Sequence, residues 1–171
     1  MAVTLNETPS GNRLHIGIFG KTNSGKSSFI NTFSGQKVSI VADVAGTTTD
    51  PVYKPMEIYP LGPCILIDTA GFDDEGELGA LRIEKTSLAA QKTELAIILF
   101  CGDEMVQELK WYNYFKKRQT PVIPVLGKAD LYTQEQKEYL IQMIQKNTGE
   151  TVCPVSSETG EGTWKIGRAH V

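Results

Sequence analysis

The chain has 171 residues, 40% hydrophobic and 22% charged, which is typical of one folded domain and excludes disordered and fibrous classes. Its net charge of -3 gives no strongly basic surface, so nucleic acid is not an expected partner. No apolar run is long enough to cross a bilayer and no signal peptide pattern is present, so we expect a cytoplasmic protein with no membrane partner.

The three cysteines, Cys64, Cys101 and Cys153, lie far apart in the sequence and in apolar surroundings. None belongs to a C-x-x-C pair or stands beside a histidine, as zinc and iron–sulfur ligands do. We therefore predict buried, reduced thiols.

Strand and helix patterns alternate along the chain after a polar segment at 1–12, which we expect to be flexible. Short apolar runs predict strands at 14–19, 52–58, 64–68, 95–101, 121–126 and 151–155. Helical spacing predicts helices at 27–33, 78–92, 106–118 and 133–147, the last one capped by Thr133. This alternation predicts an α/β fold with a doubly wound, mostly parallel sheet of about six strands and helices on both faces.

Residues 20–27 read GKTNSGKS, which fits G-x-x-x-x-G-K-[ST] between a predicted strand and a predicted helix. Glycines let backbone N–H groups surround phosphates, and the helix N-terminus adds positive potential. Lys26 would reach the β- and γ-phosphates, and the Ser27 hydroxyl would bind magnesium. The motif predicts a P-loop NTPase whose nucleotide contacts in this loop are Asn23, Ser24, Gly25, Lys26, Ser27 and Ser28.

A second motif, DTAG at 68–71, ends the predicted strand at 64–68. Asp68 would lie in the second coordination sphere of magnesium, and the Gly71 N–H would face the γ-phosphate. The hydroxyls of Thr47 and Thr48 lie on the loop between the two motifs, where they would close over the metal.

Two later segments, GKAD at 127–130 and SSE at 156–158, resemble the base-reading motifs N-K-x-D and S-A-K of GTPases. In that family the aspartate, here Asp130, accepts from guanine N1–H and the exocyclic amine, which adenine does not offer. The resemblance implies GTP and GDP as ligands, with contacts from Lys128, Asp130, Ser156 and Ser157. Gly127 replaces the usual asparagine, which braces the phosphate loop and contacts the base, so it implies weakened nucleotide affinity.

With five motifs in order, the chain resembles the TrmE/Era-like GTPases, which act in tRNA modification and ribosome assembly. Residues 6–31 and 43–86, and above all TTTDPVYK and DTAGFDDEGELG within them, look like the GTPase domain of the HydF family of FeFe-hydrogenase maturation factors. This closer resemblance implies a nucleotide switch in hydrogenase cofactor assembly. Its partners would be hydrogenase maturation proteins and apo-hydrogenase, and an iron–sulfur cluster would bind only in a further C-terminal region. The alternative is a ribosome- or tRNA-directed GTPase.

The TrmE-like resemblance also implies a potassium site. Asn23 matches the asparagine that ligates potassium there, and the other matching ligands are Ala42, Val44 and Thr47. Thr48 matches the magnesium-binding threonine. Potassium would act as a built-in arginine finger. The resemblance also allows a homodimer, formed either by potassium-loaded domains or through further domains of a longer chain. The alternative remains open that Asn23 binds no ion and only shapes its own loop.

Phe72 stands where Ras-like enzymes carry the glutamine that orients the attacking water. Glu77 is the candidate replacement implied by TrmE, with Glu75 and Glu84 as alternatives, and each can equally be a solvated surface charge. The predicted catalytic residues are Lys26, Thr48, Gly71 and Glu77. We expect slow intrinsic hydrolysis, and a non-catalytic, nucleotide-gated interaction domain remains a third possibility.

We place a GTP-binding domain at residues 13–165 and expect it to lack its last helix. The segment IGRAHV at 166–171 matches a translation of common sequencing-adapter DNA, so we expect an artefactual tail on a piece of a longer, multidomain chain.

Overall fold

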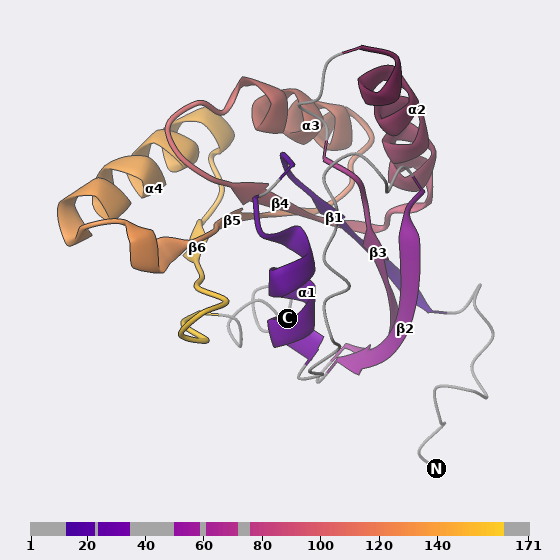
Figure 1. Cartoon of the computed structure of the whole chain (residues 1–171), viewed down its shortest axis with the longest axis horizontal. Coiled ribbons are helices and arrows are strands. Elements are labelled where there is room, and N and C mark those ends of the chain that lie inside the picture. The colour runs from indigo at the N-terminus through magenta and orange to yellow at the C-terminus, as the bar shows by residue number, and fades with distance from the viewer. Residues whose placement is uncertain (1–12, 23, 35–49, 59–60, 72–75, 163–171) are drawn as a thin grey trace.

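The computed structural model describes residues 13–22, 24–34, 50–58, 61–71 and 76–162 (Figure 1). Six strands form one sheet in the order β2-β3-β1-β4-β5-β6. Their bounds are β1 Leu14–Phe19, β2 Val52–Ile58, β3 Gly62–Asp68, β4 Leu95–Phe100, β5 Val122–Leu126 and β6 Cys153–Pro154. All neighbouring strands are parallel except β2, which pairs antiparallel with β3 at one edge. The predicted mostly parallel α/β sheet is confirmed.

Four helices cover the two faces of this sheet: α1 Lys26–Ser34, α2 Gly76–Lys92, α3 Val106–Lys117 and α4 Gln134–Thr148. Figure 1 shows α1 on one face and α2, α3 and α4 on the other. In the described part of the chain, no helix is both long and apolar enough to cross a membrane.

The core is built on both faces of the central strands, since every residue of β4 is buried. On one face, Phe29 and Ile30 of α1 pack against apolar side chains of β1, β3 and β4. On the other face, the ring centroid of Phe19 lies 4.9 Å from that of Phe115 on α3. Helices therefore pack on both faces of the sheet, and the parallel pairing of β1, β3, β4, β5 and β6 brings the carboxyl ends of these strands to one edge.

The predicted elements are all present, but several bounds differ. The helix predicted at 27–33 begins at Lys26, inside the phosphate motif. The strand predicted at 151–155 is reduced to Cys153–Pro154 at the edge of the sheet, and the Val155 N–H that follows it donates to Leu126 O. A short 3₁₀ helix at Ala129–Leu131 was not predicted.

The cysteines are free thiols, but their burial differs from the prediction. Cys64 is fully buried in the core. Cys101 and Cys153 are only partly buried, so the interpretation of three buried thiols is wrong for these two. Each lies close to a polar group, Cys101 Sγ 3.7 Å from the Tyr132 hydroxyl and Cys153 Sγ 3.6 Å from Gly162 O.

Candidate functional site

The phosphate motif runs from the end of β1 into the first turn of α1. Gly25 has a φ of 91°, which favours glycine, and its carbonyl accepts from Phe29 N at 2.8 Å as α1 begins. The loop curls around a buried amine, since Lys26 Nζ donates to Gly20 O at 2.9 Å and to Lys21 O at 2.7 Å. This arrangement holds a positive charge at the helix N-terminus, where anions bind.

Ser27 and Asp68 meet at the ends of α1 and β3. The Ser27 hydroxyl donates to Asp68 Oδ2 at 3.3 Å. A hydroxyl beside a carboxylate is the hard oxygen donor set that magnesium prefers. These two residues therefore fit the predicted magnesium site.

Gly71, which follows β3, lies directly against the phosphate loop. A Cβ built on Gly71 would be 2.3 Å from the backbone nitrogen of Thr22, a distance that no side chain tolerates. Glycine is thus required at this position for the DTAG segment and the phosphate loop to touch.

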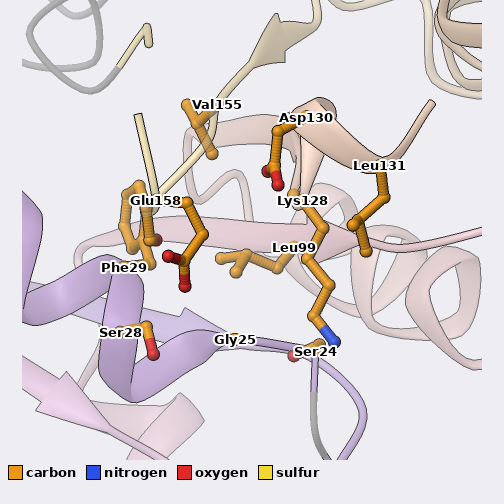
Figure 2. Close-up of a pocket in the computed structure, with 12 residues that line it drawn as sticks. Ser24, Gly25, Ser28, Phe29, Leu99, Lys128, Asp130, Leu131, Val155 and Glu158 are labelled. Carbon is orange, nitrogen blue, oxygen red and sulfur yellow. The ribbon is translucent and has the colours of Figure 1, made fainter. Parts of the chain in front are cut away.

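A cavity of about 330 Å³ opens beside the phosphate loop, at the carboxyl ends of β4, β5 and β6 (Figure 2). Several elements far apart in the sequence contribute to its wall. The lining residues are Ser24, Gly25, Ser28, Phe29, Leu99, Gly127, Lys128, Asp130, Leu131, Val155, Ser157 and Glu158. Phosphate-loop residues and GKAD residues therefore share one cavity.

The Asp130 carboxylate is held in place at this cavity. Ser156, which is fully buried, donates from its hydroxyl to Asp130 Oδ1 at 2.7 Å. The same hydroxyl accepts from Thr159 N at 3.2 Å. Asp130 itself lies on the 3₁₀ helix, which is anchored by the bond from Ala129 N to Val155 O at 2.9 Å. A fixed carboxylate at the rim of an apolar slot can accept two parallel N–H donors from a planar ring.

Lys128 joins the two loops along the cavity wall. Its backbone is left-handed, with a φ of 54°, which is uncommon for a residue other than glycine. Its side chain extends toward the phosphate loop, and Cε lies 3.8 Å from where a Cβ of Gly25 would stand (Figure 2).

The structure thus brings together Ser24, Gly25, Ser28, Lys128, Asp130 and Ser157 around one cavity, with Ser156 behind Asp130 and with Lys26, Ser27, Asp68 and Gly71 beside it. The other predicted site residues, Asn23, Ala42, Val44, Thr47 and Thr48, lie outside the described residues, as do Phe72, Glu75 and the side chain of Glu77. The potassium ligands and the water-orienting residue therefore stay predictions. Glu84 is exposed on α2.

Sequence reasoning missed the apolar lining of the cavity. Phe29, Leu99 and Val155 lie in a predicted helix and two predicted strands, and no cavity role was predicted for them. In the structure they belong to the core and also line the cavity. Glu158, which replaces the lysine of the S-A-K motif, also lines the cavity. The position of Phe29, two residues after the phosphate motif, was the available signal for this role.

Comparison with known proteins matches the model of the 50S ribosome-binding GTPase family to residues 15–128. GTPase Der of Wolinella succinogenes is 37% identical over 140 residues, which cover 78% of this chain and 29% of that protein. The tRNA modification GTPase MnmE of Aliarcobacter butzleri is 35% identical over 153 residues, covering 84% of this chain and 33% of that protein. The chain spans no more than about a third of the length of these curated relatives.

A solved structure of Era from Aquifex aeolicus, bound to GDP and AlF4⁻, superposes with a TM-score of 0.78 and 26% sequence identity. The superposition covers 91% of this chain and 55% of the Era chain. The matched family model spans the phosphate motif, the DTAG segment and the start of the GKAD motif. The structure places phosphate-loop and GKAD residues around one cavity, and Gly71 of the DTAG segment lies against the phosphate loop. The chain therefore belongs to the family of 50S ribosome-binding GTPases.

Proposed function

We propose that this chain binds guanine nucleotide with magnesium and hydrolyses GTP. The observation that carries the proposal is the fixed carboxylate of Asp130, held by Ser156, in a cavity that also contains phosphate-loop residues Ser24 and Gly25. A guanine ring in this cavity would offer N1–H and its amine to Asp130, and the phosphates would extend toward Lys26.

The chain's own residues supply the binding and much of the electrostatics of phosphoryl transfer. Lys26 presents its ammonium group from a cradle of two backbone carbonyls. Ser27 and Asp68 would hold magnesium, which neutralises charge on the β- and γ-phosphates when bound. Preorganised charge of this kind stabilises the transition state without reorganisation during the reaction.

The substitution Asp130→Asn tests the choice of base. The substitution replaces one carboxylate oxygen by an amide N–H donor, which would face one of the two guanine donors, so GTP affinity should fall about 100-fold. The same amide N–H can bind the second carbonyl of xanthine, so affinity for XTP should rise. Fluorescence titration with labelled GDP and competition by XTP measures both. The matched control is Glu135→Gln, an exposed carboxylate on α4 outside the cavity lining. Unchanged GTP affinity in Asp130→Asn would remove the base-reading role.

We further propose that potassium accelerates GTP hydrolysis by this chain. This proposal rests on the resemblance of Asn23 to the potassium ligand of TrmE-like proteins. Single-turnover GTP hydrolysis should run severalfold faster in potassium chloride than in sodium chloride at equal ionic strength. Equal rates in the two salts would remove the case for Asn23 as an ion ligand. Complete absence of turnover in potassium would instead favour a non-catalytic, nucleotide-gated domain.

For the biological role we favour a ribosome- or tRNA-directed GTPase. The support is the family description and the relatives Der, MnmE and Era. Cosedimentation with 50S subunits, in the presence of a non-hydrolysable GTP analogue and then of GDP, tests it. Nucleotide-dependent comigration that Asp130→Asn abolishes would support this role, and absence of comigration with either nucleotide would count against it.

A hydrogenase maturation role is the second candidate, and the segments TTTDPVYK at 47–54 and DTAGFDDEGELG at 68–79 favour it. None of the relatives reported above is a hydrogenase maturation protein, so this role rests on those segments alone. Copurification with tagged hydrogenase maturation proteins, and not with ribosomal particles, would favour it over the first.

A further inference from the structure

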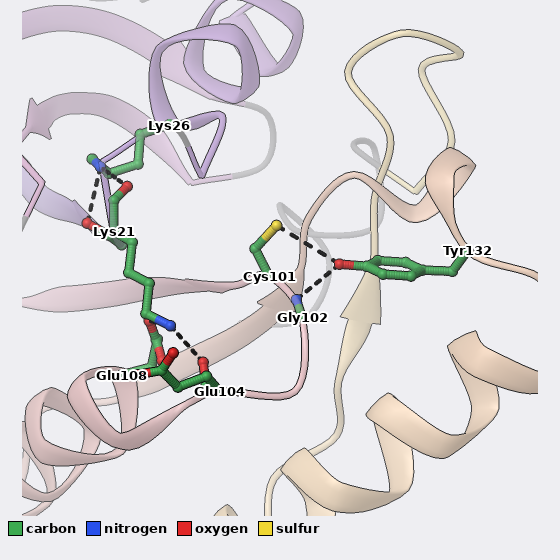
Figure 3. Close-up of polar contacts among 8 residues, drawn as sticks. Lys21, Lys26, Cys101, Gly102, Glu104, Glu108 and Tyr132 are labelled. Atoms are coloured by element: carbon green, nitrogen blue, oxygen red, sulfur yellow. Dashed lines mark hydrogen bonds and ion pairs between the residues drawn. The ribbon is translucent and has the colours of Figure 1, made fainter. Parts of the chain in front are cut away.

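The loop between β4 and α3, residues 101–105, contacts both halves of the nucleotide site (Figure 3). The phosphate loop reaches it from one end and the segment after GKAD from the other. Lys21 belongs to the phosphate motif, but its partners Glu104 and Glu108, and the contact of Tyr132 with Gly102, lie outside the nucleotide-binding motifs.

On the phosphate side the contact is made by Lys21. Its Nζ donates to Glu104 O at 2.5 Å and lies 3.5 Å from Glu108 Oε1 in the first turn of α3. The Glu108 side chain is 1% exposed and that of Lys21 is 18% exposed, so water screens this pair weakly. The backbone oxygen of Lys21 accepts from Lys26 Nζ at 2.7 Å. One residue therefore binds α3 with its side chain and the phosphate-binding amine with its carbonyl.

On the base side the contact is made by Tyr132, two residues after Asp130. Its hydroxyl accepts from Gly102 N at 2.8 Å and lies 3.7 Å from Cys101 Sγ. Burial, with a smaller effect of the Cys101 thiol, raises the pKa of Tyr132 to about 12, so the phenol is protonated at neutral pH. Gly102 has a φ of 79°, a left-handed conformation that favours glycine at this contact.

Gly127 carries no side chain that could join the two loops directly. A Cβ on Gly127 would lie 3.4 Å from Ser24 O, so the two backbones are near neighbours without a side-chain bridge between them. The contacts of Tyr132 and Lys21 with residues 101–105 make that connection by another route.

We propose that the β4–α3 loop couples the base-reading loop to Lys26, with Tyr132, Lys21 and Glu108 as positioning residues for GTP hydrolysis. The inference rests on the proposed GTPase function. Loss of the Tyr132 contact with Gly102, or of the Lys21 contact with Glu108, lets residues 101–105 shift. Because Lys21 contacts this loop, its carbonyl, which holds the Lys26 amine, shifts as well. A structural change beside the guanine site therefore alters the position of the Lys26 amine at the phosphates.

A double-mutant cycle tests this coupling, with the variants Tyr132→Phe, Glu108→Gln and both together. The readouts are the dissociation constant for labelled GDP and the single-turnover hydrolysis rate at saturating GTP. We expect each single variant to lower the saturated rate about fivefold, the scale of one lost hydrogen bond. The double variant should be no slower than the slower single variant, because both substitutions break one connection. Independent effects would multiply, to roughly 25-fold.

Tyr112→Phe is the matched control. It removes a hydroxyl of α3 that donates to Thr148 O, on the side of α3 that faces α4. It should lower the melting temperature while leaving both nucleotide readouts within about twofold of the parent, since that hydroxyl contacts neither loop.

Two outcomes would overturn the inference: multiplicative effects in the double variant, or a Tyr132→Phe variant that binds GTP more weakly but hydrolyses it at the parental rate when saturated. The second outcome would make Tyr132 a local support of the base loop only. If the parent chain itself fails to bind GTP, the proposed function is wrong. If the parent binds GTP and the variants behave like the parent, only the coupling inference is wrong.

Discussion

At the residue scale, Gly127 leaves a gap that a side chain could fill. An asparagine amide at this position would reach Ser24 O, since the Cβ position is 3.4 Å from that oxygen and Gly127 does not have a positive φ. Gly127→Asn should tighten GDP binding about fivefold, as expected for one added hydrogen bond. Titration with fluorescent GDP measures the change.

Gly127→Ala distinguishes the effect of the asparagine amide on GDP affinity from the effect of adding any side chain. Its methyl group would make only close van der Waals contact with Ser24 O and adds no donor. We expect it to bind GDP no tighter than the parent. Equal affinities for the alanine and asparagine variants would show that no bond to Ser24 forms.

Residues that belong to a local motif could be assigned to the candidate site from the sequence. Residues brought there by contacts between distant segments could not. The motif spacing was enough to pick out Lys26 and Asp130. The pairing of Lys21 with Glu104 and Glu108 joins segments more than 80 positions apart, since the Lys21–Glu104 separation is 83. No local pattern encodes such a contact, because it depends on how α3 packs beside β1 and β4.

At the element scale, α4 shows how local signals set a helix. Thr133 Oγ1 accepts from Gln136 N at 3.2 Å, and Gln136 Oε1 accepts from Thr133 N at 3.0 Å, which completes a capping box. Gly149 ends the helix with a φ of 72°. The prediction of Thr133 as the cap is confirmed.

Thr133→Ala should lower the free energy of unfolding by about 1 kcal/mol, because it leaves the Gln136 N–H without its side-chain acceptor. Urea denaturation followed by circular dichroism measures it. Gln142→Ala is the control, an exposed position inside the same helix where little change is expected. Nucleotide affinity should be unaffected in both, and an equal loss of stability in the two variants would argue against the cap as the cause.

The strands and helices were predicted well because their patterns are continuous, as in the wholly apolar β4. The 3₁₀ helix at Ala129–Leu131 was not predicted because three residues are too few to show a helical spacing of apolar side chains. Its shape comes from a tertiary bond, Ala129 N to Val155 O, and from the left-handed Lys128 that precedes it. The element that presents Asp130 was therefore the one that sequence reasoning could not describe.

At the scale of the whole molecule, the core places a titratable thiol where ionisation opposes folding. Burial raises the pKa of Cys64 from 9.0 to about 11. The unfolded chain loses this proton first as pH rises, so the stabilisation is complete below about pH 9 and is lost between pH 9 and 11. Urea unfolding at several pH values should show stability falling across this window.

Cys64→Ala should flatten that fall, because the variant has no thiol to ionise, although the smaller side chain lowers stability at every pH. The comparison is the slope of unfolding free energy against pH between 9 and 11, not its absolute value. Identical slopes in parent and variant would assign alkaline unfolding to other groups, such as Tyr132, whose pKa is about 12.

The carbonyl cradle around Lys26 has a consequence for the entropy of ligand binding. A free lysine side chain samples many rotamers, and ordering it on binding costs about 0.5–1.5 kcal/mol. Gly20 O and Lys21 O already fix the amine, and the side chain is buried. The entropy cost of ordering this side chain is therefore met during folding. A phosphate group beside Lys26 would meet an ordered cation and would bind more tightly than it would to a mobile lysine.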